Sequence, residues 1–170
     1  MNYSRAKVII SFVGYLVICL GLSLLQSTGI LTLQIKTASA LLVLPAVIYA
    51  GYYYGDTLGG IIGFVAGALT DVYASTLCYN TIILAFIGFS CGFITSHYFN
   101  KNVSAAVVLN VVVSALYFFV KWILFYAFRD PTPHLILLNY TLPSIIYTGV
   151  VGIVIYFLAN PILNRIQPKS

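Results

Sequence analysis

The sequence is poor in charged residues and contains no glutamate. Only 6% of its 170 residues are charged, whereas 61% are apolar. A soluble domain of this length needs many more polar side chains to cover its surface. The composition therefore excludes an ordinary soluble domain. It predicts an all-α integral membrane protein, because helices satisfy their own backbone hydrogen bonds in lipid.

Residues that could carry out catalysis or hold a metal are also scarce. The three cysteines, Cys19, Cys78 and Cys91, form no C-x-x-C pair, so the sequence predicts neither a disulfide framework nor a zinc site. We find no carboxylate pair and no glycine loop of the phosphate-binding type. We therefore expect no catalytic residue, no cofactor and no metal.

One short motif resembles an enzyme signature. The stretch "GFSCG", from Gly88 to Gly92, matches the G-x-S-x-G pattern of a nucleophile elbow. That elbow needs a turn from strand to helix, and the sequence predicts no strand. Ser90 and His97 would lie about 10 Å apart along one helix, too far for a nucleophile and its base. We expect Ser90 to be a small packing residue.

Apolar segments fill almost the whole chain and predict six membrane-spanning helices, since one span needs about 20 apolar residues. The expected spans are residues 8–25, 38–54, 57–73, 80–97, 103–128 and 140–160. Only the connection before residue 38 and the stretch "RDPTPHLILLN" exceed a tight turn. Pro45 and Pro143 fall inside spans, where we expect kinks. Without any linker, residues 1–170 are expected to form a single transmembrane domain.

Lysine and arginine are distributed unevenly between the two ends of these helices. Cytoplasmic connections retain more of these residues than external connections do. Six alternating spans put five of them on one side: Arg5, Lys7, Lys101, Arg165 and Lys169. Only Lys36 and Arg129 fall on the other side. We therefore expect both termini in the cytoplasm, and basic residues that contact anionic lipid and not nucleic acid.

The third expected span contains glycines at a regular spacing of four residues. Small residues allow helix backbones to approach closely in lipid. At 100° per residue, this spacing forms an inclined ridge on the helix surface. The ridge could pack on the fourth span, or it could bind a transmembrane helix of another protein. The ridge and its possible partners are Gly55, Gly59, Gly63, Gly67, Gly88 and Gly92.

A buried charge follows the ridge at Asp71. A charged side chain at the middle of the bilayer costs about 2.5–3.5 kcal/mol on insertion scales, so this carboxylate needs a partner or water. On the fifth span, polar residues recur within an arc of about 60°, which should face protein or a cavity. These residues are Asn110, Ser114, Tyr117 and Lys121, and Asn80 begins the fourth span.

Two arrangements of these polar groups remain open at this point. In one, Asp71 sets the position of the ridge through a polar contact with the fifth helix, at Lys121 or Tyr117. In the other, Lys121 extends towards the interface beside aromatic residues while Asp71 caps its own helix. Both arrangements satisfy the carboxylate.

The stretch "GFVAGALTDV", followed by "TLCYNTIILAFIGFSCGFI", resembles the central signature of the rod shape-determining protein MreD family. The later stretch "LNYTLPSIIYTGVVGIVIYFLANPILNRI" is similar to that family's last helix. The resemblance covers residues 41–166. The chain departs from the family pattern at Cys78, where glycine is usual, and at Ser144 and Thr148, which replace a glutamate and an asparagine. The segment before the second span also lacks the family's usual proline.

The resemblance implies a non-enzymatic scaffold of the bacterial cell-elongation machinery in the inner, or plasma, membrane. Its implied direct partner is a bitopic protein, MreC. Its indirect partners are the elongation transpeptidase and glycosyltransferase of lateral peptidoglycan synthesis, with MreB. The family's fold is similar to the substrate-binding subunit of energy-coupling-factor vitamin transporters, which remains the alternative function. That subunit needs an A-x-x-x-A docking motif on its first helix, and the first span lacks this motif.

Overall fold

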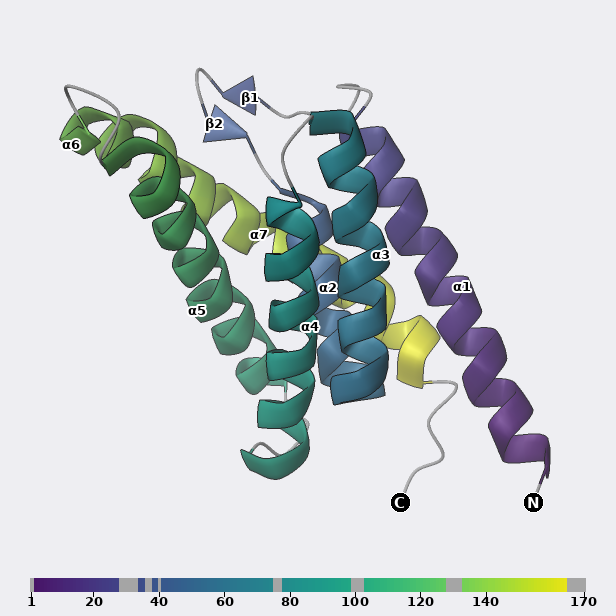
Figure 1. The fold of residues 1–170 in the computed structure, drawn as a ribbon. Coiled ribbons are helices and arrows are strands. Elements are labelled where there is room, and N and C mark those ends of the chain that lie inside the picture. Colours follow the sequence, from purple (N-terminus) through teal and green to yellow (C-terminus); the bar gives the residue numbers. More distant parts are fainter. Residues whose placement is uncertain are drawn as a thin grey trace.

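A computed structural model describes the backbone of residues 2–27, 34–35, 38–39, 41–74, 78–98, 103–127 and 133–164. This part of the chain is helical apart from one small hairpin (Figure 1). The α-helices are α1 (Asn2–Ser27), α2 (Val43–Tyr54), α3 (Asp56–Ala74), α4 (Tyr79–Tyr98), α5 (Val103–Trp122), α6 (Pro133–Ile136) and α7 (Leu142–Asn164). Two π-helical segments, η1 (Ile123–Ala127) and η2 (Leu137–Thr141), extend α5 and precede α7.

The long helices alternate in direction, and the start of α1 and the end of α7 lie at the same end of the molecule (Figure 1). Three helical stretches are long and apolar enough to cross a membrane: Tyr79–His97, Val103–Ala127 and His134–Phe157. A shorter apolar stretch covers Phe12–Gln26. The all-helical prediction is thus confirmed for this membrane protein, except at the hairpin.

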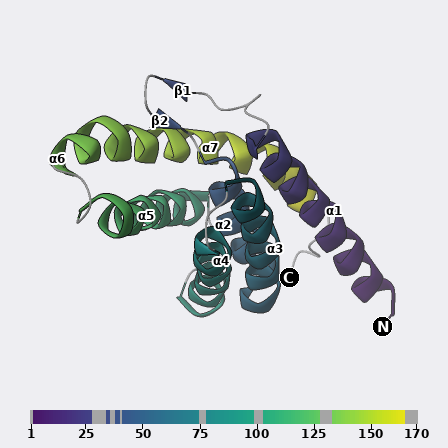
Figure 2. The ribbon, with the colours of Figure 1, turned by 45° about the horizontal axis from the view of Figure 1, so that its top comes forward.

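Helix α2 lies at the centre of the bundle, between α3 and α4 on one side and α7 on the other (Figure 2). Every residue from Val43 to Tyr53 is buried. Its 12 residues extend only about 18 Å, less than the roughly 30 Å of a bilayer core. The other helices therefore shield α2 from lipid along its length.

The span expected at residues 38–54 is wrong at its beginning. Residues Ala38–Ser39 form strand β2, which pairs antiparallel with β1 (Gln34–Ile35), so the prediction of no strand is also wrong. The helix begins only at Val43. Pro45 thus lies in the first turn, where its missing N–H breaks no helical hydrogen bond, and no kink is needed there.

The last expected span, residues 140–160, begins earlier than predicted. Helical structure starts at Pro133, so "PHLILLN" is not a loop. Proline is favoured at the first helical position because its backbone angle is already that of a helix. The π-helical segment η2 ends directly before Leu142 and Pro143, and the backbone N–H of Leu142 donates to the carbonyl of Leu137. Pro143, which has no N–H to donate, thus lies where the π-helix η2 gives way to the α-helix α7.

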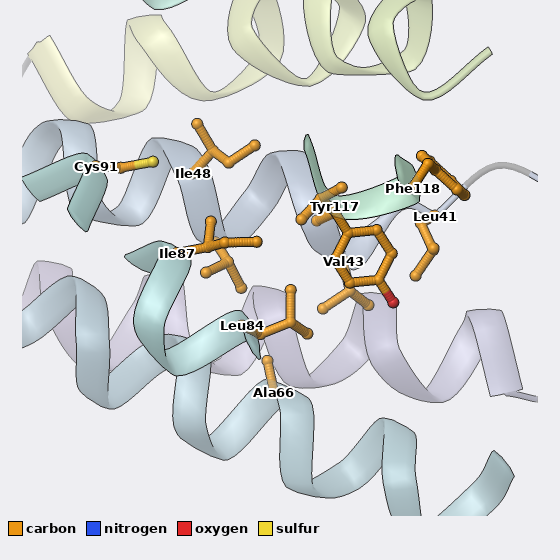
Figure 3. Packing of buried hydrophobic residues seen from close by; sticks show 11 residues of the cluster. Leu41, Val43, Ile48, Ala66, Leu84, Ile87, Cys91, Tyr117 and Phe118 are labelled. Carbon is orange, nitrogen blue, oxygen red and sulfur yellow. The ribbon is translucent and has the colours of Figure 1, made fainter. Parts of the chain in front are cut away.

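Two apolar clusters fill the interior, and α2 contributes to both. One joins α1, α2 and α7 through aromatic side chains, among them Tyr49 and Tyr156, whose ring centroids lie 5.5 Å apart. The other joins α2 to α3, α4 and α5 around Val47 and Leu84. Figure 3 shows this second cluster, with Tyr117 and Phe118 of α5 beside Leu41 and Val43. The two faces of α2 therefore organise the whole bundle.

Two described residues next to the central helices have positive φ. Gly55, with φ of 90°, separates α2 from α3. Cys78, with φ of 52°, precedes α4, at the position where the resemblance expects glycine. A side chain in this left-handed region costs roughly 1–2 kcal/mol through the clash of its Cβ. Cys78 therefore strains the backbone directly before α4.

Replacing Cys78 with glycine should relieve this strain. We expect Cys78→Gly to raise the free energy of unfolding by about 0.5–1 kcal/mol, measured by thermal unfolding in lipid nanodiscs. Cys78→Ala removes the exposed thiol but keeps Cβ, so it should leave the stability unchanged. Equal stabilisation by both variants would show that the thiol, and not the backbone conformation, is responsible.

Candidate functional site

The glycine ridge brings the backbones of α3 and α4 into direct contact. A Cβ added at Gly63 would overlap the backbone carbonyl of Leu84. At Gly67 it would lie 2.6 Å from Cα of Thr81. Both distances are shorter than real Cβ contacts, and the obstacle is backbone that cannot rotate away. The ridge therefore packs on α4 of the same chain.

Helix α2 joins this contact near the start of α3. A Cβ at Gly59 would lie 2.5 Å from Cα of Gly51 and 2.7 Å from the carbonyl oxygen of Gly88. Gly51 belongs to α2 and was not predicted as a packing residue, although the four-residue spacing of the glycines extends back to it. Gly92 approaches the backbone of Gly55 and Asp56. Glycines thus bring the backbones of α2, α3 and α4 together at this point.

Gly55 does not belong to the ridge, contrary to the sequence prediction. It lies in the turn between α2 and α3, and a Cβ there would meet nothing within 4 Å. Its role is conformational, because its φ of 90° suits glycine. The prediction was wrong because the spacing of four continues through a helix break.

The alternative of a foreign transmembrane helix on the ridge is also wrong. Helix α4 occupies the face of α3 that carries Gly59, Gly63 and Gly67, and all three glycines are buried. A second helix cannot approach the same backbone surface. The other expected members of this contact, Gly88 and Gly92, lie on α4 and complete it from the opposite side.

The carboxylate of Asp71 is 6% exposed and binds the first turn of α4. Oδ1 accepts hydrogen bonds from the backbone N–H (3.0 Å) and side-chain Nδ2 (2.9 Å) of Asn80. Oδ2 accepts from the backbone N–H (2.7 Å) and Oγ1 (2.6 Å) of Thr81. An N-cap side chain normally satisfies these N–H groups, but Cys78 occupies that position. Asp71 therefore caps α4 from a neighbouring helix.

The interpretation that Asp71 caps its own helix is wrong. Asp71 caps the following helix and not its own, and these four contacts are with α4 and not with α5. Helix α5 is reached in a second step, because Tyr117 Oη donates to Oδ1 of Asn80 at 2.6 Å. Asn80 thus links Asp71 to Tyr117, and the negative charge lies at the positive end of the α4 dipole.

Lys121 lies at the end of α5, is partly buried, and precedes the π-helical segment η1. Its neighbour Trp122 stacks on Phe119 with ring centroids 5.9 Å apart. A direct pair between Lys121 and Asp71 stays a prediction.

Further along the stripe on α5, Asn110 and Ser114 are fully buried. Asn110 donates from Nδ2 to the carbonyl of Gly149 on α7 at 3.5 Å. A Cβ at Gly152 would overlap the amide of Asn110, so glycine makes room for this side chain. The stripe therefore faces α7.

The serine of the elbow-like motif lies within α4, away from any strand in the described part of the chain. Ser90 is partly buried, and His97 lies near the end of the same helix. Nδ1 of His97 lies 3.0 Å from the carbonyl of Phe93, one turn earlier in α4. Among the described residues, no group of His, Cys, Asp and Glu could hold a metal ion.

The sequence profile of rod shape-determining protein MreD matches residues 6–166, nearly the whole chain. The chain belongs to the MreD family. No curated protein and no solved structure matches it. Membership gives this membrane protein a role in rod-shape determination. The resemblance to this family is thereby confirmed.

The α3–α4 contact of this MreD-family chain should be intolerant of a methyl group. We expect Gly63→Ala to lower the free energy of unfolding by about 1–3 kcal/mol, because the methyl group meets backbone of α4. The matched control is Gly60→Ala, where the nearest atom would be Cβ of Phe89 at 3.5 Å. That variant should be neutral or stabilising. Equal losses from both would refute the close crossing.

Asp71 should tolerate asparagine poorly, because an amide offers one acceptor oxygen where the structure uses two. Its NH₂ group would face the donors of Thr81. We expect Asp71→Asn to cost about 1–3 kcal/mol of unfolding free energy. Asp56→Asn is the control, since Oδ1 of Asp56 binds Thr57 at the open start of α3 and an amide keeps that acceptor.

A double-mutant cycle separates the two partners of Asp71 that the sequence left open. Coupling of Asp71→Asn with Tyr117→Phe should be measurable, of the order of 0.6 kcal/mol, because both bind Asn80. The same cycle with Lys121→Met tests the direct ion pair. Zero coupling with Tyr117 would contradict the link through Asn80.

Proposed function

We propose that this MreD-family protein acts by binding, as a non-enzymatic scaffold of the bacterial cell-elongation complex. The family match over residues 6–166 carries this proposal. The structure supports it through the use of its intramembrane polar groups. Asp71 of α3 accepts hydrogen bonds from the start of α4, and Tyr117 of α5 donates to Asn80 of α4. These bonds join the three helices. They serve to position helices, as a scaffold requires.

The partner that fits this proposal is an MreC-like bitopic membrane protein, bound within the membrane. Through it, the elongation transpeptidase and glycosyltransferase, together with MreB, would be reached indirectly. The glycine ridge is occupied by α4, so the partner binds elsewhere on the bundle. Lipid is the other direct partner, because the outer faces of the helices are apolar.

We also propose that the helices cross the plasma membrane six times with both termini in the cytoplasm. The start of α1 and the end of α7 at one end of the molecule support this orientation (Figure 1). The short helix α2 counts as a span because its neighbours enclose it. A cysteine introduced at Lys169 and labelled by an impermeant reagent from outside intact cells would contradict the orientation.

Co-purification with an MreC-like partner tests the proposed function. We expect the tagged chain, expressed with that partner in a strain lacking its own MreD-family protein, to retain the partner at about equal amounts and to restore rod shape. Gly60→Ala should behave like the unaltered chain in both assays. Gly63→Leu should lose both, because it disrupts the α3–α4 crossing.

Two results would contradict the scaffold. One is a folded chain that neither retains the partner nor affects lateral-wall synthesis. The other is stoichiometric, tight binding of a vitamin by the purified chain, which would instead favour the substrate-binding subunit of an energy-coupling-factor transporter.

A further inference from the structure

Four polar side chains form a layer between α5 and α7, beside α2, which we call the polar layer. All four are 0% exposed. Within the described part of the chain, Oδ1 of the asparagine and Oγ of both serines have no hydrogen-bond partner. The polar layer consists of Asn110, Ser114, Ser144 and Thr148.

Two hydrogen bonds place these residues at neighbouring levels. Asn110 Nδ2 donates to the carbonyl of Gly149 at 3.5 Å, and Gly149 directly follows Thr148 in α7. Oγ1 of Thr148 accepts from the backbone N–H of Leu41, just before α2, at 3.3 Å. Helices α5 and α7 run side by side in opposite directions (Figure 2).

The opposite directions of the two helices bring the serines together as well. Ser114 follows Asn110 by four residues, which is about one helical turn. Ser144 precedes Thr148 by the same number. Because the helices are antiparallel, both steps lead towards the same end of the bundle. Ser114 and Ser144 therefore lie one turn above Asn110 and Thr148, on facing surfaces.

Unpaired polar atoms at this depth need a physical explanation. Lipid cannot supply hydrogen bonds, and buried polar groups in native proteins nearly always have a protein or water partner. The two hydrogen bonds that these side chains do make are also long, at 3.3 and 3.5 Å, compared with the usual range of about 2.7–3.2 Å. The contacts between α5 and α7 alone leave the layer incomplete.

We propose that the polar layer is a binding site for water molecules inside the bundle. Oδ1 of Asn110 only accepts hydrogen bonds, whereas the serine hydroxyls both donate and accept. The occupant must therefore also donate and accept. An anion would be repelled by the amide oxygen, and a cation would find no carboxylate in the layer. Water meets both requirements, as buried waters typically make about three hydrogen bonds.

Radiolytic hydroxyl-radical labelling of the full chain in lipid nanodiscs tests this proposal, because bound water generates radicals in place. The side chains of Leu109, Val113 and Ile145 adjoin the layer in sequence. We expect them to be modified several-fold faster than Leu22 of α1 and Ile83 of α4, which are also partly buried and apolar but are not part of α5 or α7. Equal rates in the two groups would overturn the proposal.

The sign of a stability change provides a second, independent measurement. Ser114→Ala and Ser144→Ala should each lower the thermal midpoint by about 2–4 °C, because each removes a hydroxyl bonded to water. The control is Ser23→Ala, whose equally buried hydroxyl donates to the carbonyl of Cys19 in α1. The proposal is supported if the two layer variants lower the thermal midpoint as much as Ser23→Ala does. A raised midpoint, expected when an unpaired hydroxyl is removed from a dry layer, would overturn it.

Discussion

The backbone contact between α3 and α4 is the constraint on which the rest of the bundle depends. In lipid, helices gain nothing by hiding apolar side chains from their surroundings, so association relies on close packing and polar contacts. Glycines at 59, 63 and 67 leave no side chain at the points where α3 comes nearest to α4, so the backbones are in direct contact. Asp71 then restricts sliding, because its oxygens reach the N–H groups of one turn only.

The buried position of helix α2 depends on this close crossing. Gly51 and Gly59 let α2 join the α3–α4 pair so closely that a 12-residue helix is enclosed on all sides. Enclosure allows it to be shorter than the bilayer core, since its ends do not meet lipid. Its second face then carries the aromatic cluster with α1 and α7. One short central helix thus connects the tight glycine contact to the rest of the molecule.

The α5–α7 side of the bundle is built on a different principle. There, two π-helical segments and Pro143 interrupt regular winding, and fully buried polar residues replace close glycine ridges. Tyr117 connects this side to the capped start of α4 through Asn80. In this MreD-family chain, one side of the bundle is thus joined by close glycine contacts and the other contains buried polar residues.

The sequence by itself determined the helical membrane character, the helices at 57–73, 80–97 and 103–128, and the polar stripe facing the interior, because hydropathy and periodicity are local properties. It could not locate the start of α2, since the apolar run from residue 38 continues unbroken through strand β2 into the helix.

Only the tertiary structure decided that α4 covers the glycine ridge and that Asp71 caps α4. A spacing shows which face of a helix is smooth or polar, but not which neighbour meets it. The hydrogen bonds of Asp71 cross nine and ten residues and a turn at Cys78, so they depend on how two helices are placed. That placement is a property of the packed chain and not of any segment within it.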